Sequence, residues 1–415
     1  MNGPVDPGRT RRTYLHELWR SGAAGVIETA GGTFLLLIAV RWFEAGAMAK
    51  GLVAGAGSLG LLLSPLVVSW TTGAGWPTGK AAARILAAGA ASFFLAAAMG
   101  GFLPGYVVCC VLGMASSAAV IPLLTQMYQD NYPEKERGRL FSRTVMVRIA
   151  AAAGFSYLAK EWLGDDLHRF PEWLLLSFGG ALAFASFCLS RCPTNPIPHD
   201  GGAHPLRALR FVRDDALFRR TLICWMLMGF ANLMMLPLRV EYLANPKYQQ
   251  SVPLGMIVLL TGVIPNLVRL VMSPIWGHLF DRINFFALRV TLNIGFALGI
   301  LTFFTSQSTT GLVAGAIIYG ISNAGGDVAW SLWVTKFAPP GRVADYMAAH
   351  TFLTGIRGVA APLLAFYFVN HLSLAVLAGF SAALILAATA LLLPELKFGR
   401  QARAGSPLVE EEVPD

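Results

Sequence analysis

The stretch PLGMIVLLTGVIPNLVRLVMSPIWG, residues 253–277, is apolar over its whole length except for one charge, Arg269. A helix of about 20 apolar residues spans the roughly 30 Å hydrocarbon layer of a bilayer, so this stretch predicts a transmembrane helix. A charge at that depth is costly unless it faces a bundle interior or a water-filled cavity. The stretch therefore indicates a membrane protein that keeps a polar group among its helices.

The rest of the chain has the same apolar character. Of its 415 residues, 55% are hydrophobic and 13% are charged, whereas a soluble domain carries about 25% charged residues. Further spans are predicted near residues 21–43, 49–70, 81–101, 105–128, 140–161, 172–191, 219–242, 287–305, 311–335, 343–369 and 373–393. The predicted fold is an all-α membrane protein with twelve transmembrane helices.

A polar segment rich in proline and glycine divides these spans six plus six. We expect an N-terminal tail (1–20), a six-helix bundle (21–191), a basic linker (192–218), a second six-helix bundle (219–394) and a disordered C-terminal tail (395–415). In the linker, Arg207, Arg210 and Arg213 predict a basic helix along the membrane surface. Weak similarity between residues 113–139 and 320–342 indicates that the bundles are repeats.

The basic residues orient the chain. Most of the 32 Lys and Arg lie on the tails and on the loops that share their side, while the opposite loops hold only Arg41, Lys50, Lys160, Arg169, Arg239 and Lys247. By the positive-inside rule both termini, the linker and the tails are cytoplasmic. The net charge of +9 then faces anionic lipid, and no nucleic acid is expected as a partner. We expect an integral multi-pass monomer in the plasma membrane, the inner membrane in a bacterium.

Five charged residues lie inside predicted spans: Glu28, Arg148, Arg269, Asp327 and Arg357. At 1.5 Å per residue, Arg357 lies about 22 Å into its helix, too deep for its side chain to reach the interface easily. Their depth makes these residues the first candidates for substrate binding or coupling.

Polar side chains also align along three helices. The aligned sets are Asn266, Arg269 and Ser273 in the eighth span, Tyr319, Asn323, Asp327 and Trp330 in the tenth, and His350, Thr354 and Arg357 in the eleventh. Such stripes are either functional surfaces or hydrogen-bonded seams between helices.

Glu28 lies on a glycine-rich helix, which lets another helix or a solute come close. Three roles are open for it: a proton carrier, a permanent ion pair with Arg148, or a direct contact with the solute.

Two loops carry a family resemblance. Gly277 to Arg282 ends in Asp-Arg, and the loop 130–139 contains Tyr-Pro followed by Arg-Gly. With twelve spans and a basic linker, the chain resembles the major facilitator superfamily of secondary transporters from about residue 15 to 395. The corresponding first-half loop, 71–80, lacks the Asp-Arg pair.

The resemblance implies that spans 1, 4, 7 and 10 line a cavity, while spans 2, 5, 8 and 11 form the interface between the halves. It also implies that Asp281 and Arg282 anchor their loop and stabilise one conformation. Because spans 5 and 10 can meet in such folds, Arg148 and Asp327 are a candidate gate that forms when the protein opens outward. The alternative is a static pair.

The resemblance predicts alternating access, and the charges suggest what is moved. Three buried arginines against two carboxylates favour an anionic or zwitterionic solute. Buried Glu28, Asp327 and His350 favour proton symport, and the chain has no ATP-binding motif, so no cofactor is expected beyond coupling to protons. Export of an amphiphilic drug or lipid, and a receptor that binds without transport, are the alternatives. No cluster of residues supports an enzyme or a metal site.

Overall fold

The computed structural model describes residues 6–165, 168–196, 209–248, 252–333 and 343–396. Helices make up nearly all of these ranges, and no strand occurs in them apart from a single bridge between Pro77 and Pro196. The all-α class predicted from the sequence is therefore confirmed.

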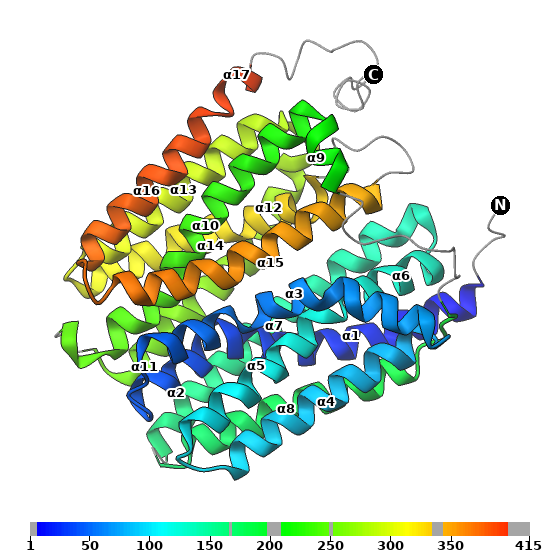
Figure 1. Ribbon diagram of the computed structural model, residues 1–415, viewed down its shortest axis with the longest axis horizontal. Helices are drawn as coiled ribbons and strands as arrows, with labels where there is room; N and C mark the ends of the chain where they lie inside the picture. Colours follow the sequence, from blue (N-terminus) through cyan, green and yellow to red (C-terminus); the bar gives the residue numbers. More distant parts are fainter. Residues whose placement is uncertain (1–5, 166–167, 197–208, 249–251, 334–342, 397–415) are drawn as a thin grey trace. The chain divides into compact units, whose positions relative to one another are not determined.

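The chain forms two compact units, which are coloured blue to green and green to red along the sequence in Figure 1. Unit 1 comprises Met1–Gly202 together with Leu243–Val263, and unit 2 comprises Ala203–Tyr242 and Ile264–Asp415. The division between the halves therefore lies close to the predicted linker. Residues 243–263 are the exception, because they come from the second half of the sequence and pack with unit 1.

Unit 1 contains six long helical rods among its described residues. They are α1 (Pro7–Thr29) continued by η1 (Ala30–Phe34) and α2 (Leu35–Arg41), α3 (Ala47–Gly73), α4 (Thr78–Ala98), α5 (Leu103–Ala119) continued by α6 (Ile121–Asn131), α7 (Glu134–Asp165) and α8 (Phe170–Ser190). The main packing partners are α4 with α8, α3 with α5, and α1 with α7. Two short segments, α11 (Leu254–Val258) and η4 (Leu259–Val263), pack on α7.

Unit 2 also contains six long helices in the part of the chain that is described. They are α10 (Ala216–Ala244), α12 (Ile264–Arg282), α13 (Phe285–Thr305), α14 (Thr309–Leu332), α15 (Val343–Phe368) and α16 (Leu374–Ala390). Short helices α9 (Arg210–Asp214) and α17 (Leu393–Leu396) flank them. Helix α14 packs on both α12 and α13, and α16 packs on α13.

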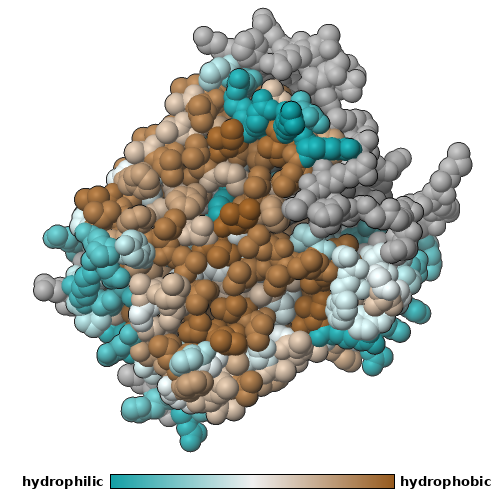
Figure 2. All heavy atoms as spheres, viewed as in Figure 1, coloured by the Kyte–Doolittle hydropathy of each residue, from teal (hydrophilic) through white to brown (hydrophobic). Residues whose placement is uncertain are grey.

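Ten helices within the described ranges are long and apolar enough to cross a membrane. The other two rods are α7, whose first turns carry many charges, and α16, which is apolar but only 17 residues long. Large apolar side chains such as Leu66, Val271 and Phe380 remain exposed on the helices, and apolar residues dominate the face seen in Figure 2. This surface suits lipid and not water. The protein is an integral, multi-pass membrane protein.

The N-terminal segment differs from the sequence prediction. Helix α1 begins at Pro7, so residues 7–20 are helical and not a tail. The Asp6 side chain accepts a hydrogen bond from the Gly8 amide, and proline suits the first helical position because it lacks an N–H there. In the linker, Arg210 and Arg213 lie in α9, whereas Arg207 and the tail from 397 onward lie outside the described residues.

Candidate functional site

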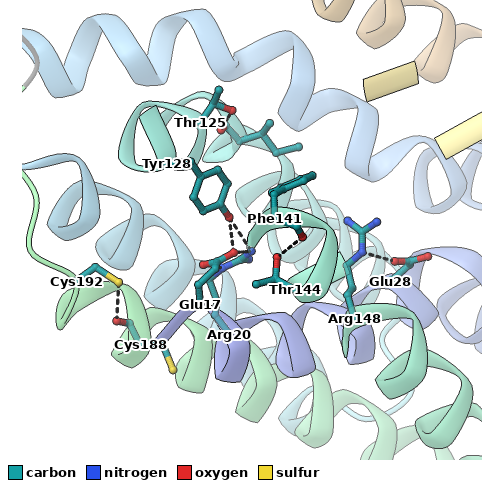
Figure 3. Close-up of polar contacts among 11 residues, drawn as sticks. Glu17, Arg20, Glu28, Thr125, Tyr128, Phe141, Thr144, Arg148, Cys188 and Cys192 are labelled. Carbon is teal, nitrogen blue, oxygen red and sulfur yellow. Dashed lines mark hydrogen bonds and ion pairs between the residues drawn. The ribbon is translucent and has the colours of Figure 1, made fainter. Parts of the chain in front are cut away.

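Glu28 and Arg148 form an ion pair between α1 and α7 in unit 1 (Figure 3). Arg148 Nε lies 3.1 Å from Glu28 Oε2, but its N–H is not aligned for a hydrogen bond. The side chains are 36% and 29% exposed, respectively. This pair was one of the alternatives that the sequence left open. Its geometry makes it an electrostatic contact that solvent can reach.

Gly25 explains why the two charges meet. A Cβ atom at Gly25 would overlap the Arg148 carbonyl oxygen and lie 2.9 Å from the Ala152 amide nitrogen. The missing side chain therefore lets α1 and α7 approach closely. Glu28 lies three residues further along α1, on the same face as Gly25, so it reaches Arg148.

Directly after Glu28, the rod changes from α-helical to π-helical in η1. The segment η4 is a second π-helical turn, and the two turns contact each other. Thr33 Oγ1 donates a hydrogen bond to Thr261 Oγ1 at 3.2 Å, and the Thr261 hydroxyl donates in turn to the Ile257 carbonyl at 2.7 Å. Single π-helical turns inside α-helices are frequent at functional sites.

A second charge cluster in unit 1, which is buried, was missed from the sequence. Glu17 accepts two hydrogen bonds from Arg20, at 2.7 Å and 2.5 Å, and a third from the Tyr128 hydroxyl (Figure 3). Glu17 is only 1% exposed. It was overlooked because residues 7–20 were assigned to a tail, where a carboxylate would be solvated. Every member of the cluster has a hydrogen-bond partner, so we interpret the cluster as a structural contact that stabilises unit 1.

In unit 2, Arg269 of α12 and Asp327 of α14 form a tighter pair. Arg269 donates to Asp327 Oδ2 from Nη2 at 2.6 Å and from Nε at 3.1 Å, and its Nη1 donates to Asn266 at 2.8 Å. The Arg269 side chain is 6% exposed and that of Asp327 is 35% exposed. The polar stripes predicted for the eighth and tenth spans therefore contact each other, and Arg269 is ion-paired with the Asp327 carboxylate.

The stripe of the eleventh span is buried in unit 2. His350, Thr354 and Arg357 are 0%, 7% and 9% exposed. The His350 ring lies among three indoles, with centroids 5.7 Å from Trp225, 5.6 Å from Trp330 and 5.1 Å from Trp333.

Two further arginines of unit 2 are buried, although neither was among the candidates singled out from the sequence. Arg239 stacks on the Tyr319 ring with its Cζ 3.9 Å from the centroid, beside a cavity of about 10 Å³ that Asn232 also lines. Arg289, on the second turn of α13, lies 3.5 Å over the Trp225 ring and is 1% exposed. The signal that could have found them is their position, since each lies inside a predicted span, 219–242 or 287–305, close to its end.

The remaining candidates are placed as follows. Asn323 and Trp330 are partly buried on α14. The side chains of Asp281 and Arg282 lie outside the described residues, so their anchoring role stays a prediction. The exchange of partners that a gate between Arg148 and Asp327 requires also stays a prediction, because each residue is described here in a pair within its own unit.

Metal binding gains no support from the described residues, among which no group of three His, Cys, Asp or Glu could hold an ion. The five cysteines are buried and unpaired with one another: Cys109, Cys110, Cys188, Cys192 and Cys224. Burial raises the pKa of the Cys192 thiol, just beyond α8, to about 12.

Two helical units that hold arginine–carboxylate pairs among apolar helices define a multi-pass membrane protein of the transporter class. The sequence profile of the Major Facilitator Superfamily matches residues 81–362, and the chain belongs to this superfamily. It is therefore a secondary carrier of small molecules and not an enzyme. A comparison with curated proteins found no match.

Solved structures agree on the fold. The nucleoside transporter NupG is similar with a TM-score of 0.69 and 13% identity, over 93% of this chain and 99% of that one. The inward-open xylose transporter XylE from E. coli is similar with a TM-score of 0.67 and 14% identity, over 97% of this chain and 98% of that one. An auto-inhibited POT family peptide transporter is similar with a TM-score of 0.69 and 12% identity, over 96% of this chain and 98% of that one. At these identities the similarity shows the fold alone.

Proposed function

We propose that this carrier moves a small anionic or zwitterionic solute by alternating access, coupled to protons. The observation that carries the proposal is that each unit holds a partly exposed carboxylate against an arginine: Glu28 with Arg148, and Asp327 with Arg269. Charged residues inside a membrane are energetically costly, and those that are retained there usually mark a pathway for a substrate, an ion or a proton.

The loose pair in unit 1 suits exchange of partners. Arg148 is about one-third exposed and meets Glu28 without an aligned hydrogen bond. A solute carboxylate or phosphate that binds the guanidinium with two aligned hydrogen bonds can therefore compete with Glu28. Glu28 then takes up a proton, which leaves it neutral once Arg148 has changed partner. In this way, binding of the solute is linked to binding of a proton.

Asp327 supplies the second half of the cycle. In the proposal, Arg148 turns to Asp327 when the protein opens outward, as the gate inferred from the sequence requires. The two π-helical turns joined by Thr33 and Thr261 both lie in unit 1, although residues 243–263 come from the second half of the sequence. In the proposal this contact breaks and re-forms during the cycle.

The charge of the solute follows from the arginines that have no carboxylate. Arg289 and Arg357 form no ion pair with any residue in the described ranges, whereas Glu28 and Asp327 are both engaged. A neutral ring-shaped solute is a second candidate, because Trp330 is partly exposed one turn from Asp327 and could stack on a sugar or base.

A screen of solutes against the purified protein tests the proposal. Unfolding midpoints are measured with carboxylates, amino acids, phosphate esters, sugars and nucleosides at two pH values, and each hit is then tested for counterflow in proteoliposomes. We expect carboxylates or phosphate esters to raise the midpoint, more so at the lower pH, and to exchange. Exchange of neutral solutes or amphiphiles only would refute the assigned solute class, and binding without exchange would indicate a receptor.

A further inference from the structure

Unit 2 contains a buried group of cationic and polar side chains from three helices. Arg289 comes from α13, Arg357 and His350 come from α15, and Trp225 lies between them on α10. The exposed fractions are 1% for Arg289, 9% for Arg357, 0% for His350 and 2% for Trp225. We call these four residues the arginine–tryptophan cluster.

The cluster has many donors and few acceptors. All three guanidinium nitrogens of Arg289, Nε of Arg357 and Nε1 of Trp225 are buried donors with no hydrogen-bond partner among the described residues. Neither ring nitrogen of His350, one of which is a donor in the neutral ring, has a partner there. Buried donors in folded proteins are almost always paired, so each exception needs an explanation. Here the exceptions occur together, and most of them are cationic.

The contacts that do exist hold the cations in place without neutralising them. The Arg289 guanidinium stacks 3.5 Å over the Trp225 ring, and Arg357 Nη1 donates to the Trp225 carbonyl. Stacking on an indole stabilises a cation, but it leaves the N–H groups in the guanidinium plane unsatisfied. The nearby carboxylate of Glu395 is bound by Arg220 at 2.5 Å.

Gly229 makes room for this arrangement. A Cβ atom at that position would overlap Nη1 and Cζ of Arg357. The absence of a side chain therefore lets the guanidinium lie against the backbone of α10, one turn from Trp225. A position that admits an arginine so closely indicates that the placement of its charge matters.

We propose that Arg289 and Arg357, with His350 and the indole N–H of Trp225, bind one compact oxyanion, a carboxylate or a phosphate group. The guanidinium groups supply paired donors in the geometry that such oxygens accept. The anion belongs to the transported solute if the proposed function holds, and to a lipid headgroup or free phosphate otherwise. The inference thus rests on the proposed function only for the source of the anion.

Binding is tested with inorganic phosphate and with acetate as probes. The purified full-length protein is unfolded by heat in detergent at constant ionic strength, with chloride as the balancing ion. Both probes are expected to raise the midpoint. Arg289→Gln and Arg357→Gln are expected to weaken the apparent affinity about tenfold or more, because hydrogen bonds to charged groups are lost. Arg213→Gln, on exposed α9, is the matched control and keeps the wild-type response.

Two further variants keep the test decisive if a glutamine variant folds poorly. Gly229→Ala retains every charge but displaces Arg357, so it should also reduce the response to the probes. Arg289→Met removes a buried cation, which raises the midpoint if the site is empty and lowers it in the presence of a bound anion. The proposal would be overturned if Arg289→Met raised the unfolding midpoint even in the presence of phosphate and acetate, and if neither probe changed the midpoint of the wild type.

Phosphorus analysis and competition experiments distinguish the two possible sources of the anion. A phospholipid source predicts lipid phosphorus that stays with the delipidated wild type and is lost in Arg289→Gln. A solute source predicts that a carboxylate or phosphate solute competes with the probes and undergoes counterflow. Probe binding without counterflow of any solute would refute the proposed function and leave the site intact, whereas counterflow without probe binding would refute the site alone.

Discussion

Arg269 binds Asp327 through two hydrogen bonds to a single carboxylate oxygen, at 2.6 Å and 3.1 Å, and is itself buried beside Asn266. The pair in unit 1 differs, since Glu28 and Arg148 make one contact without an aligned hydrogen bond and both are about one-third exposed. We infer that the pair in unit 2 is the more stable of the two, and that the pair in unit 1 changes partner more readily.

The first prediction compares the two pairs. Asp327→Asn leaves the buried Arg269 with a weaker acceptor and is expected to lower the free energy of unfolding by about 1–3 kcal/mol. Glu28→Gln is expected to cost less than about 1 kcal/mol, because solvent screens this pair. Unfolding midpoints in detergent measure both variants. Equal losses would contradict the distinction between a tight and a loose pair.

The second prediction concerns the close approach of α1 and α7. Gly25→Ala forces the helices apart, because the new Cβ meets the backbone of α7, and we expect a loss of about 1–3 kcal/mol. Gly22→Ala is the matched control on the same helix, since nothing lies within 4 Å of a Cβ there. Alanine is the better helix former, so this control should be neutral or slightly stabilising. A neutral Gly25→Ala would show that the two helices do not need this contact.

The third prediction separates transport from coupling. Glu28→Gln removes the carboxylate that the proposal assigns to the proton, while Arg148 remains available to the solute. Counterflow should therefore continue, and accumulation driven by a pH gradient should be lost. Both are measured in proteoliposomes with the same labelled solute. Unchanged accumulation in the variant would assign the proton to another residue.

The fourth prediction uses the contact between the π-helical turns. The hydroxyl oxygens of Thr33 and Thr261 are 3.2 Å apart, so cysteines at both positions are close enough to be cross-linked. We expect the double substitution Thr33→Cys, Thr261→Cys to stop transport on oxidation and to recover it on reduction. Thr33→Cys alone controls for the substitution. Full activity of the cross-linked protein would mean that this contact stays closed throughout the cycle.

Much of the fold could be predicted from hydropathy. The long helices lie where apolar stretches occur, because span length is fixed by bilayer thickness. Helix ends were less certain. Placing residues 7–20 in a tail hid Glu17, since a residue in the first turns of a helix looks the same in sequence as one outside it. Arg289 was inside the predicted span 287–305 but close to its end, where an arginine is expected to reach the interface, so the arginine–tryptophan cluster was not recognised.

The ion-pair partners of the charged residues were harder to predict than the positions of these residues inside the spans. Glu28 and Arg148 were placed inside predicted spans, and their pairing was one alternative, but the sequence does not show that Gly25 brings α1 onto α7. Arg269 was a candidate for substrate binding or coupling, and the sequence did not indicate that its partner within unit 2 is Asp327. Which charges neutralise one another depends on helix packing, and a stripe on one helix carries no information about the helix opposite.

Counterflow in proteoliposomes tests the central claim most directly. The carboxylate or phosphate solute that most raises the unfolding midpoint is loaded inside the vesicles, and uptake of the labelled solute is followed for the wild type, Arg148→Gln and the surface control Arg213→Gln. The account predicts exchange by the wild type and the control, and its loss in Arg148→Gln. Undiminished exchange by Arg148→Gln, or no exchange by the wild type, would contradict it.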